Sequence, residues 1–162
     1  MGGTFRQLYT AAWIEVFLII SGALVIAGLS AASLPILFAV HPRTSGALER
    51  CGIAVGPNVH RTAPVGYLES LAILRRAAVV VTDSGGLQRE AYWLRRRCIT
   101  VRSETEWVET VDCGANRLVP PEQAAALPEA IALASAAAEP GWDIGAYGDG
   151  QAARHIAELL RD

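Results

Sequence analysis

The stretch "AAVVVTDSGGLQREAYWL", residues 77–94, decides the fold of this chain. An apolar run as long as a buried strand ends at Thr-Asp-Ser-Gly-Gly, and apolar residues then return with helical spacing. The Ser84 hydroxyl is placed to cap that helix, and Gly85 and Gly86 have no Cβ, so a ligand can approach the backbone closely. Glu90 follows about one helical turn later and is suited to accept hydrogen bonds from ribose hydroxyls.

The free amides at the start of such a helix form a ready site for phosphate. Together with a carboxylate suited to ribose, the turn predicts a site for a nucleoside diphosphate. The alternative is a βα turn that needs its glycines only for tight packing, because short glycine motifs also occur without a ligand.

From residue 34 onward, short apolar strands alternate with helices of about ten residues, a pattern typical of a parallel α/β sheet. Strands covered on both faces read as continuous apolar runs, as "ILFAV" and "AVVV" do. We therefore predict an α/β fold, a Rossmann-like parallel sheet with helices on both faces. The expected strands are 36–40, 58–65 (a strand or an extended link), 78–82, 98–101 and 116–119, and the expected helices are 44–52, 66–77, 86–97, 106–114, 121–138 and 150–162.

Residues 13–40 differ from the rest because they carry a single charge, Glu15. The uncharged part that follows is long enough to span a bilayer as a helix. Pro35 separates the short β-rich run 36–40 from it, and that run is typical of a core strand. The remaining part, 16–34, has three interpretations: a membrane helix, a fully buried helix, or an N-terminus altered by truncation or a wrong start.

These observations predict two parts. Residues 1–33 form an atypical apolar segment, expected to be helical, and residues 34–162 form the Rossmann-like domain.

Composition excludes several classes of function. The 14 Lys and Arg against 16 Asp and Glu give a net charge of −2, without the basic footprint of a nucleic-acid-binding protein. Cys51, Cys98 and Cys113 are an odd number and lack the spacing of zinc ligands or of a disulfide framework. We expect a cytoplasmic protein with reduced thiols, with no metal, no cofactor and no nucleic-acid partner.

Four stretches in this order carry a closer resemblance: "HPRT", "GYLESLAILRRAAVVVTDSGGLQREA", "RSETEWVETVDCGANRLV" and "YGDGQAARHI". Together they resemble the C-terminal half of the non-hydrolysing UDP-N-acetylglucosamine 2-epimerases, from about residue 34 to the C-terminus. That family has two Rossmann-like domains of the GT-B type, with UDP held mostly by the C-terminal one. The resemblance implies epimerisation of UDP-N-acetylglucosamine to UDP-N-acetylmannosamine by elimination and re-addition of UDP.

The resemblance also implies roles for single residues. Ser84, Gly85 and Gly86 hold the diphosphate, and Glu90 holds the ribose. His41 and Arg43 face the cleft between the domains, where family members can bind a second, regulatory UDP-sugar. The polar stretch after residue 101 lies near the same cleft, with Arg102 and Glu106 as its functional pair. The alternative for this stretch is a capping box with a solvated first turn, since "SETE" fits one.

This sequence departs from the family in two respects. The acid and base carboxylates of the family belong to the N-terminal domain, and the family's His-Arg-x-Glu-Asn motif is absent before His41. Ser70 stands where many relatives carry an aromatic residue that stacks on uracil. We therefore expect the chain to bind a UDP-sugar, to need an N-terminal domain or a homo-oligomer as partner, and to be inactive alone.

Two other functions remain open from the sequence. A GT-B glycosyltransferase would share the fold and the nucleotide site. A non-catalytic sugar-nucleotide-binding module, anchored in a membrane through residues 16–34, would explain both the apolar segment and the missing carboxylates.

Overall fold

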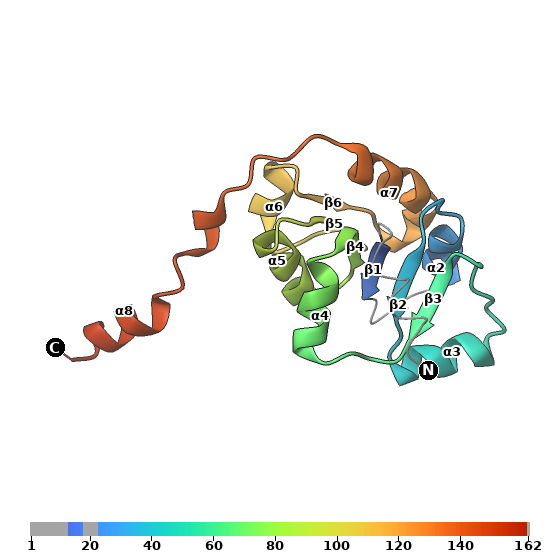
Figure 1. The fold of residues 1–162 in the computed structure, drawn as a ribbon, viewed down its shortest axis with the longest axis horizontal. Coiled ribbons are helices and arrows are strands. Elements are labelled where there is room, and N and C mark those ends of the chain that lie inside the picture. Colours follow the sequence, from blue (N-terminus) through green and yellow to red (C-terminus); the bar gives the residue numbers. More distant parts are fainter. Residues whose placement is uncertain (1–12, 18–22, 162) are drawn as a thin grey trace.

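The computed structural model describes residues 13–17 and 23–161 (Figure 1). Its sheet has six parallel strands in the order β3-β2-β1-β4-β5-β6. This is the strand order of the Rossmann fold, and it confirms the predicted fold class. The strands are β1 (Trp13–Phe17), β2 (Ile36–Ala39), β3 (Val59–Thr62), β4 (Ala77–Thr82), β5 (Arg97–Thr100) and β6 (Asn116–Leu118).

Helices cover both faces of this sheet, as predicted (Figure 1). Helices α2 and α7 pack together on one face, and α4 and α5 lie against β4 on the other. The helices are α2 (Ala23–Ser30), α3 (Pro42–Arg50), α4 (Tyr67–Leu74), α5 (Gly85–Trp93), α6 (Val108–Asp112), α7 (Leu127–Ala136) and α8 (Ala152–Leu159), with short 3₁₀ turns η1 (Pro121–Ala126) and η2 (Ile144–Tyr147).

Strand β4 shows why its sequence is apolar without interruption. Val79 and Val81 join the larger core cluster, to which α2 and α7 contribute. Val80 belongs to a second cluster together with Leu74 of α4 and Ala91 of α5. Successive side chains of a strand point to opposite faces, so a strand with helices on both faces must be apolar at every position.

The structure divides the N-terminal segment, where it is described, into a strand and a helix of the sheet domain. Strand β1 lies in the middle of the sheet, where Glu15 is in register with Leu37 of β2 and Val80 of β4. Helix α2 is eight residues long and buries Val25, Ile26 and Leu29 in the core. The apolar sequence of α2 follows from its packing under η1 and α7.

The prediction that residues 1–33 form a separate helical segment is therefore wrong, because β1 and α2 belong to the sheet domain. Residues 1–12 and 18–22, which that prediction also included, lie outside the described residues. In the described part of the chain, no helix is both long enough and apolar enough to cross a membrane. Of the three interpretations of 16–34, a membrane helix disagrees with the strand that ends at Phe17, whereas a buried helix agrees with α2.

The C-terminal segment leaves the domain after crossing its surface (Figure 1). The hydroxyl of Tyr92 holds this segment, because it donates to the carbonyl oxygen of Asp143 (2.8 Å) and accepts from the amide of Asp143 (2.9 Å). Helix α8 beyond it has no buried residue, and Ile156, Leu159 and Leu160 are exposed. The amphipathic helix predicted at the C-terminus is present, with its apolar side uncovered.

Candidate functional site

The turn between β4 and α5 lies at the carboxyl edge of the sheet, beside the point where the strand order reverses. The predicted capping bond from the Ser84 hydroxyl is wrong, because Ser84 makes no side-chain bond to the helix. Instead, the Ser84 amide donates to the side-chain oxygen of Thr82 (3.0 Å), which closes the turn. The first amides of α5 have no carbonyl partner inside the helix, so they form a positive end at this edge.

Gly85 begins α5, and the space next to it is bounded by two side chains of a neighbouring loop. A methyl group added to its Cα would lie 2.9 Å from Glu106 Oε1 and 3.4 Å from Trp107 Nε1. The first of these distances is shorter than a van der Waals contact. Glycine therefore leaves room for the side chains of Glu106 and Trp107 beside the first turn of α5.

The neighbouring loop brings a predicted pair of charges to this turn. Arg102 Nη1 lies 2.9 Å from Glu106 Oε2, and the two side chains are 34% and 53% exposed. Such an exposed ion pair adds little to stability, since the median is about 0–1 kcal/mol. Its charges therefore remain available to a ligand. The capping-box alternative is not realised, because the residue that precedes α6 is Trp107 and it makes no side-chain cap.

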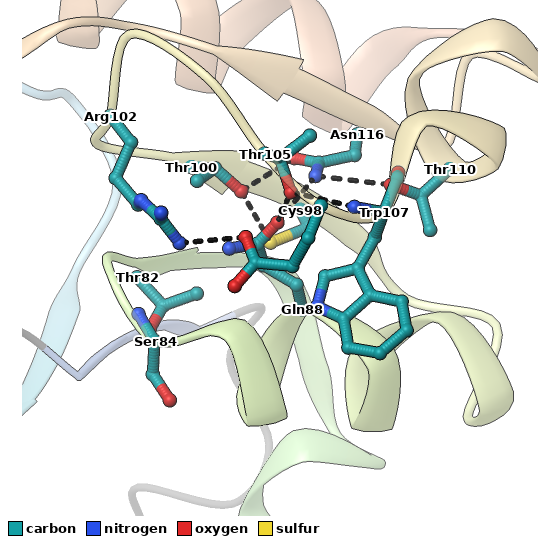
Figure 2. A network of polar contacts seen from close by, with 11 residues as sticks. Thr82, Ser84, Gln88, Cys98, Thr100, Arg102, Thr105, Trp107, Thr110 and Asn116 are labelled. Carbon is teal, nitrogen blue, oxygen red and sulfur yellow. Dashed lines mark hydrogen bonds and ion pairs between the residues drawn. The ribbon is translucent and has the colours of Figure 1, made fainter.

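A buried polar network behind the turn fixes the loop to α5 (Figure 2). Gln88, which is 1% exposed, accepts hydrogen bonds from Thr105 Oγ1 (2.6 Å) and Asn116 Nδ2 (3.3 Å). Asn116 also accepts from Thr100 Oγ1 (2.9 Å) and donates to Thr110 Oγ1 (3.2 Å). The sequence interpretation missed this network. The available signal was a glutamine at position 88, on the same side of α5 as the buried Ala91.

Replacing Asn116 by Ala should destabilise the fold. The substitution removes the acceptor of the buried Thr100 hydroxyl. It also removes one hydrogen bond each from Gln88 and Thr110, and we expect the free energy of unfolding to fall by about 1–3 kcal/mol. Urea denaturation followed by circular dichroism measures this loss. The matched control is Arg117→Ala on the same strand, whose exposed side chain predicts a change within about 0.5 kcal/mol. Equal stability of the two variants would contradict the importance of the network.

Arg89 sits between two indole rings on the side of α5 that faces the loop. Its guanidinium carbon lies 4.7 Å from the ring centre of Trp107 and 5.1 Å from that of Trp93. Both tryptophan rings therefore lie within cation–π distance of this guanidinium. Tyr147 packs edge-on against Trp107, with ring centres 5.5 Å apart, and donates to Glu109 Oε2 (3.2 Å). The aromatic side chains connect the C-terminal segment to the loop.

Glu90 lies one turn after Gly86 and therefore on the same side of α5. Partial burial raises the pKa of its carboxyl above the ordinary value of 4.5, and the positive charge of Arg89 opposes that shift. A carboxylate that is partly removed from water is well suited to accept hydrogen bonds from a ligand.

The other predicted residues lie further along the same edge or outside it. His41 is exposed and follows β2, which is separated from β4 by β1. Arg43 is in the first turn of α3, and its side chain is outside what the structure describes. Ser70 is buried in α4, with 8% of its surface exposed.

Comparison with known proteins identifies the family. The model of the family described as UDP-N-acetylglucosamine 2-epimerase matches residues 21–161. The chain belongs to the UDP-N-acetylglucosamine 2-epimerase family. The resemblance predicted from the sequence is thereby confirmed, and the match begins before residue 34, in agreement with α2 being part of the domain.

Two curated relatives each match 78% of this chain. The UDP-2,3-diacetamido-2,3-dideoxy-D-glucuronate 2-epimerase of Pseudomonas aeruginosa is 42% identical over 78% of the chain and 34% of its own length. A UDP-N-acetylglucosamine 2-epimerase homolog of Methanococcus maripaludis is 40% identical, again over 78% of the chain and over 36% of its own length. The chain thus spans about a third of the length of these curated relatives.

Solved structures of the epimerase family confirm the fold. The Methanocaldococcus jannaschii UDP-GlcNAc 2-epimerase in complex with UDP-GlcNAc and UDP superposes with a TM-score of 0.78 at 26% identity, over 98% of the chain and 48% of that protein. A glycotransferase of kitacinnamycin superposes with a TM-score of 0.55 at 17% identity, which shows a shared fold alone.

Proposed function

We propose that this chain supplies the UDP-binding half of a UDP-N-acetylglucosamine 2-epimerase and holds the diphosphate between the first turn of α5 and the loop that carries Arg102. The observation that carries this proposal is the open first turn at Gly85, placed at the carboxyl edge beside Arg102, Glu106 and Trp107. The binding of UDP-GlcNAc and UDP by the solved relative from M. jannaschii supports the choice of ligand.

The proposed reaction is an elimination followed by re-addition. A base removes the proton at C2 of the sugar while the bond between C1 and the diphosphate oxygen breaks, which gives a 2-acetamidoglucal and UDP. UDP then adds back to C1, and a proton returns to C2 from the other face. The part of this chain is to hold UDP while it is free, because the amides of α5 and the Arg102 guanidinium stabilise the negative charge on the leaving diphosphate.

The partner that we propose is a second, N-terminal half that supplies the base for C2. The uncovered apolar side of α8, with Ile156, Leu159 and Leu160, agrees with a partner that packs against the C-terminal segment. A UDP-2,3-diacetamido-uronate is a second candidate substrate, since the relative named for that sugar is 42% identical. Displacement of bound UDP by each of the two sugar nucleotides measures their affinities, and the one that binds more tightly is the better candidate substrate.

Titration calorimetry of the purified chain tests the proposed ligand. UDP should bind, and inorganic pyrophosphate should bind more weakly because it lacks the ribose that Glu90 recognises. Binding of pyrophosphate as tight as that of UDP, or no heat with UDP, would contradict a nucleotide site at this edge.

Glu90→Ala separates recognition of ribose from recognition of phosphate. If the carboxylate accepts hydrogen bonds from ribose hydroxyls, the substitution should weaken UDP binding by about 1.5–3 kcal/mol, the usual range for charged hydrogen bonds. The affinity for pyrophosphate should stay the same or rise, because a nearby negative charge has been removed. Equal losses for both ligands would mean that Glu90 acts only through the fold.

The raised pKa of Glu90 also predicts a dependence on pH. Only the ionised carboxylate accepts from both hydroxyls, so affinity for UDP should fall as the pH drops through this pKa, and the fall should begin above the pH expected for a glutamate with a pKa of 4.5. Glu90→Gln is the control, since it lacks this ionisation while the phosphates of UDP titrate as before. A parallel pH profile in the variant would exclude Glu90 as the titrating group.

A further inference from the structure

Trp107 is fixed against α5 from several sides. Its backbone amide donates to Thr105 Oγ1 (3.1 Å), and Thr105 in turn donates to the buried Gln88 (2.6 Å). Its ring lies on the guanidinium of Arg89 and meets the ring of Tyr147 edge-on. In Figure 2 the nitrogen edge of the indole is turned toward Gln88 of α5. The side chain therefore presents this edge to the first turns of the helix in one orientation.

The indole N–H has no role in holding that arrangement. Trp107 Nε1 is buried and has no hydrogen-bond acceptor among the residues that the structure describes. Leaving a buried donor without an acceptor costs about 1–3 kcal/mol, so such groups are uncommon and call for an explanation. The stacking on Arg89 and Tyr147 needs only the ring and would be kept by a phenylalanine.

Two distances place this donor next to the proposed diphosphate site. A methyl group on Gly85 would lie 3.4 Å from Trp107 Nε1 and 2.9 Å from Glu106 Oε1. Glu106 Oε1 and the indole nitrogen of Trp107 thus both lie beside the start of α5. The other carboxylate oxygen of Glu106, Oε2, is paired with Arg102. Glu106 is half exposed, so its side chain can move away without loss of buried contacts.

We propose that the indole N–H of Trp107 donates a hydrogen bond to the diphosphate of the ligand, which displaces the Glu106 carboxylate from the first turn of α5. This inference rests on the proposed UDP site. The displacement uncovers the indole nitrogen and removes a negative charge from the neighbourhood of the phosphates. It also breaks the ion pair of Glu106 with Arg102, whose guanidinium then faces the incoming negative charge.

The test compares two tryptophans that stack on the same cation. Trp107→Phe keeps a ring on Arg89 and removes the N–H, and we expect it to weaken binding of both UDP and pyrophosphate by roughly 10- to 100-fold. Trp93→Phe is the matched control, because Trp93 also stacks on Arg89 and contacts Tyr147 but is exposed. The affinity of Trp93→Phe for UDP should stay within about twofold of that of the unchanged protein. Thermal denaturation checks that both variants are folded.

Nuclear magnetic resonance of ¹⁵N-labelled unchanged protein gives a second readout that does not depend on a variant. The indole N–H resonance of Trp107, assigned from triple-resonance spectra, should move downfield as UDP saturates the chain. UDP binding with an unmoved resonance, or with full affinity in Trp107→Phe, would overturn this inference and leave the proposed function standing. A lack of UDP binding by the unchanged chain would overturn the proposed function and this inference together.

Discussion

Purified alone, the chain should neither exchange the C2 proton of UDP-N-acetylglucosamine nor form UDP-N-acetylmannosamine. Removal of that proton needs a base within hydrogen-bond reach of C2, and we propose that the base belongs to a second half. Glu104, Glu106 and Glu109 are present near the site, but Glu106 pairs with Arg102 and Glu109 accepts from Tyr147. Positioning of a catalytic group alone can lower the activation barrier by about 7–11 kcal/mol. A chain that lacks the positioned base should therefore have no detectable activity.

Proton NMR of UDP-N-acetylglucosamine in deuterated water measures this activity. Addition of a separately expressed N-terminal half of a related epimerase should restore deuterium incorporation at C2, and α8 should then become protected from amide exchange. Product that forms in proportion to the amount of this chain alone would contradict the need for a second half. The Trp107→Phe variant, combined with the same N-terminal half, keeps the base but binds UDP more weakly. Its rate of deuterium incorporation therefore shows the effect of weaker UDP binding alone.

Gly85→Val should abolish UDP binding while the fold is kept. A branched side chain at this position fills the space between the first turn of α5 and the loop, where we place the diphosphate. The three atoms nearest to an added Cβ belong to the side chains of Glu106 and Trp107, and the half-exposed Glu106 side chain can swing into water. We expect at least about a 100-fold loss of affinity, corresponding to two charged hydrogen bonds.

A second glycine provides the control for this substitution. Gly141 has no atom within 4 Å of an added Cβ, so Gly141→Val tests the exchange of glycine for valine away from the site. Calorimetry should find unchanged UDP affinity in Gly141→Val and none in Gly85→Val, with matching circular dichroism spectra. Full affinity in a folded Gly85→Val variant would place the diphosphate elsewhere.

Local patterns were enough to predict the strand, turn and helix where we propose the site. The predicted strand 78–82 is β4, which begins one residue earlier. The predicted helix 86–97 is α5, which also begins one residue earlier and ends at Trp93. Gly52 and Gly114 end their helices with positive φ values of 62° and 78°, in agreement with the predicted stops. These features depend on neighbours in the sequence, which is why the sequence reveals them.

Features that depend on distant residues were not predicted. β1 was hidden in a long apolar run, because periodicity does not distinguish a central strand from a buried helix. The hydrogen bond between Gln88 and Asn116 joins residues 28 positions apart, so no local sequence pattern predicts it. The stacking of Trp107 on Arg89 depends on how the loop after β5 folds back over α5, which is a tertiary effect.

Mapping of UDP onto the chain by ¹⁵N–¹H correlation spectra tests the central claim most directly. We predict that the backbone amides of Ser84, Gly85, Gly86 and Glu90 and the side chain of Arg102 shift in a saturable way with UDP. The amides at the opposite, amino-terminal edge of the strands, near Gly114 before β6, should stay in place. Saturable shifts centred on that opposite edge, or no shifts at millimolar UDP, would contradict a UDP site at the start of α5.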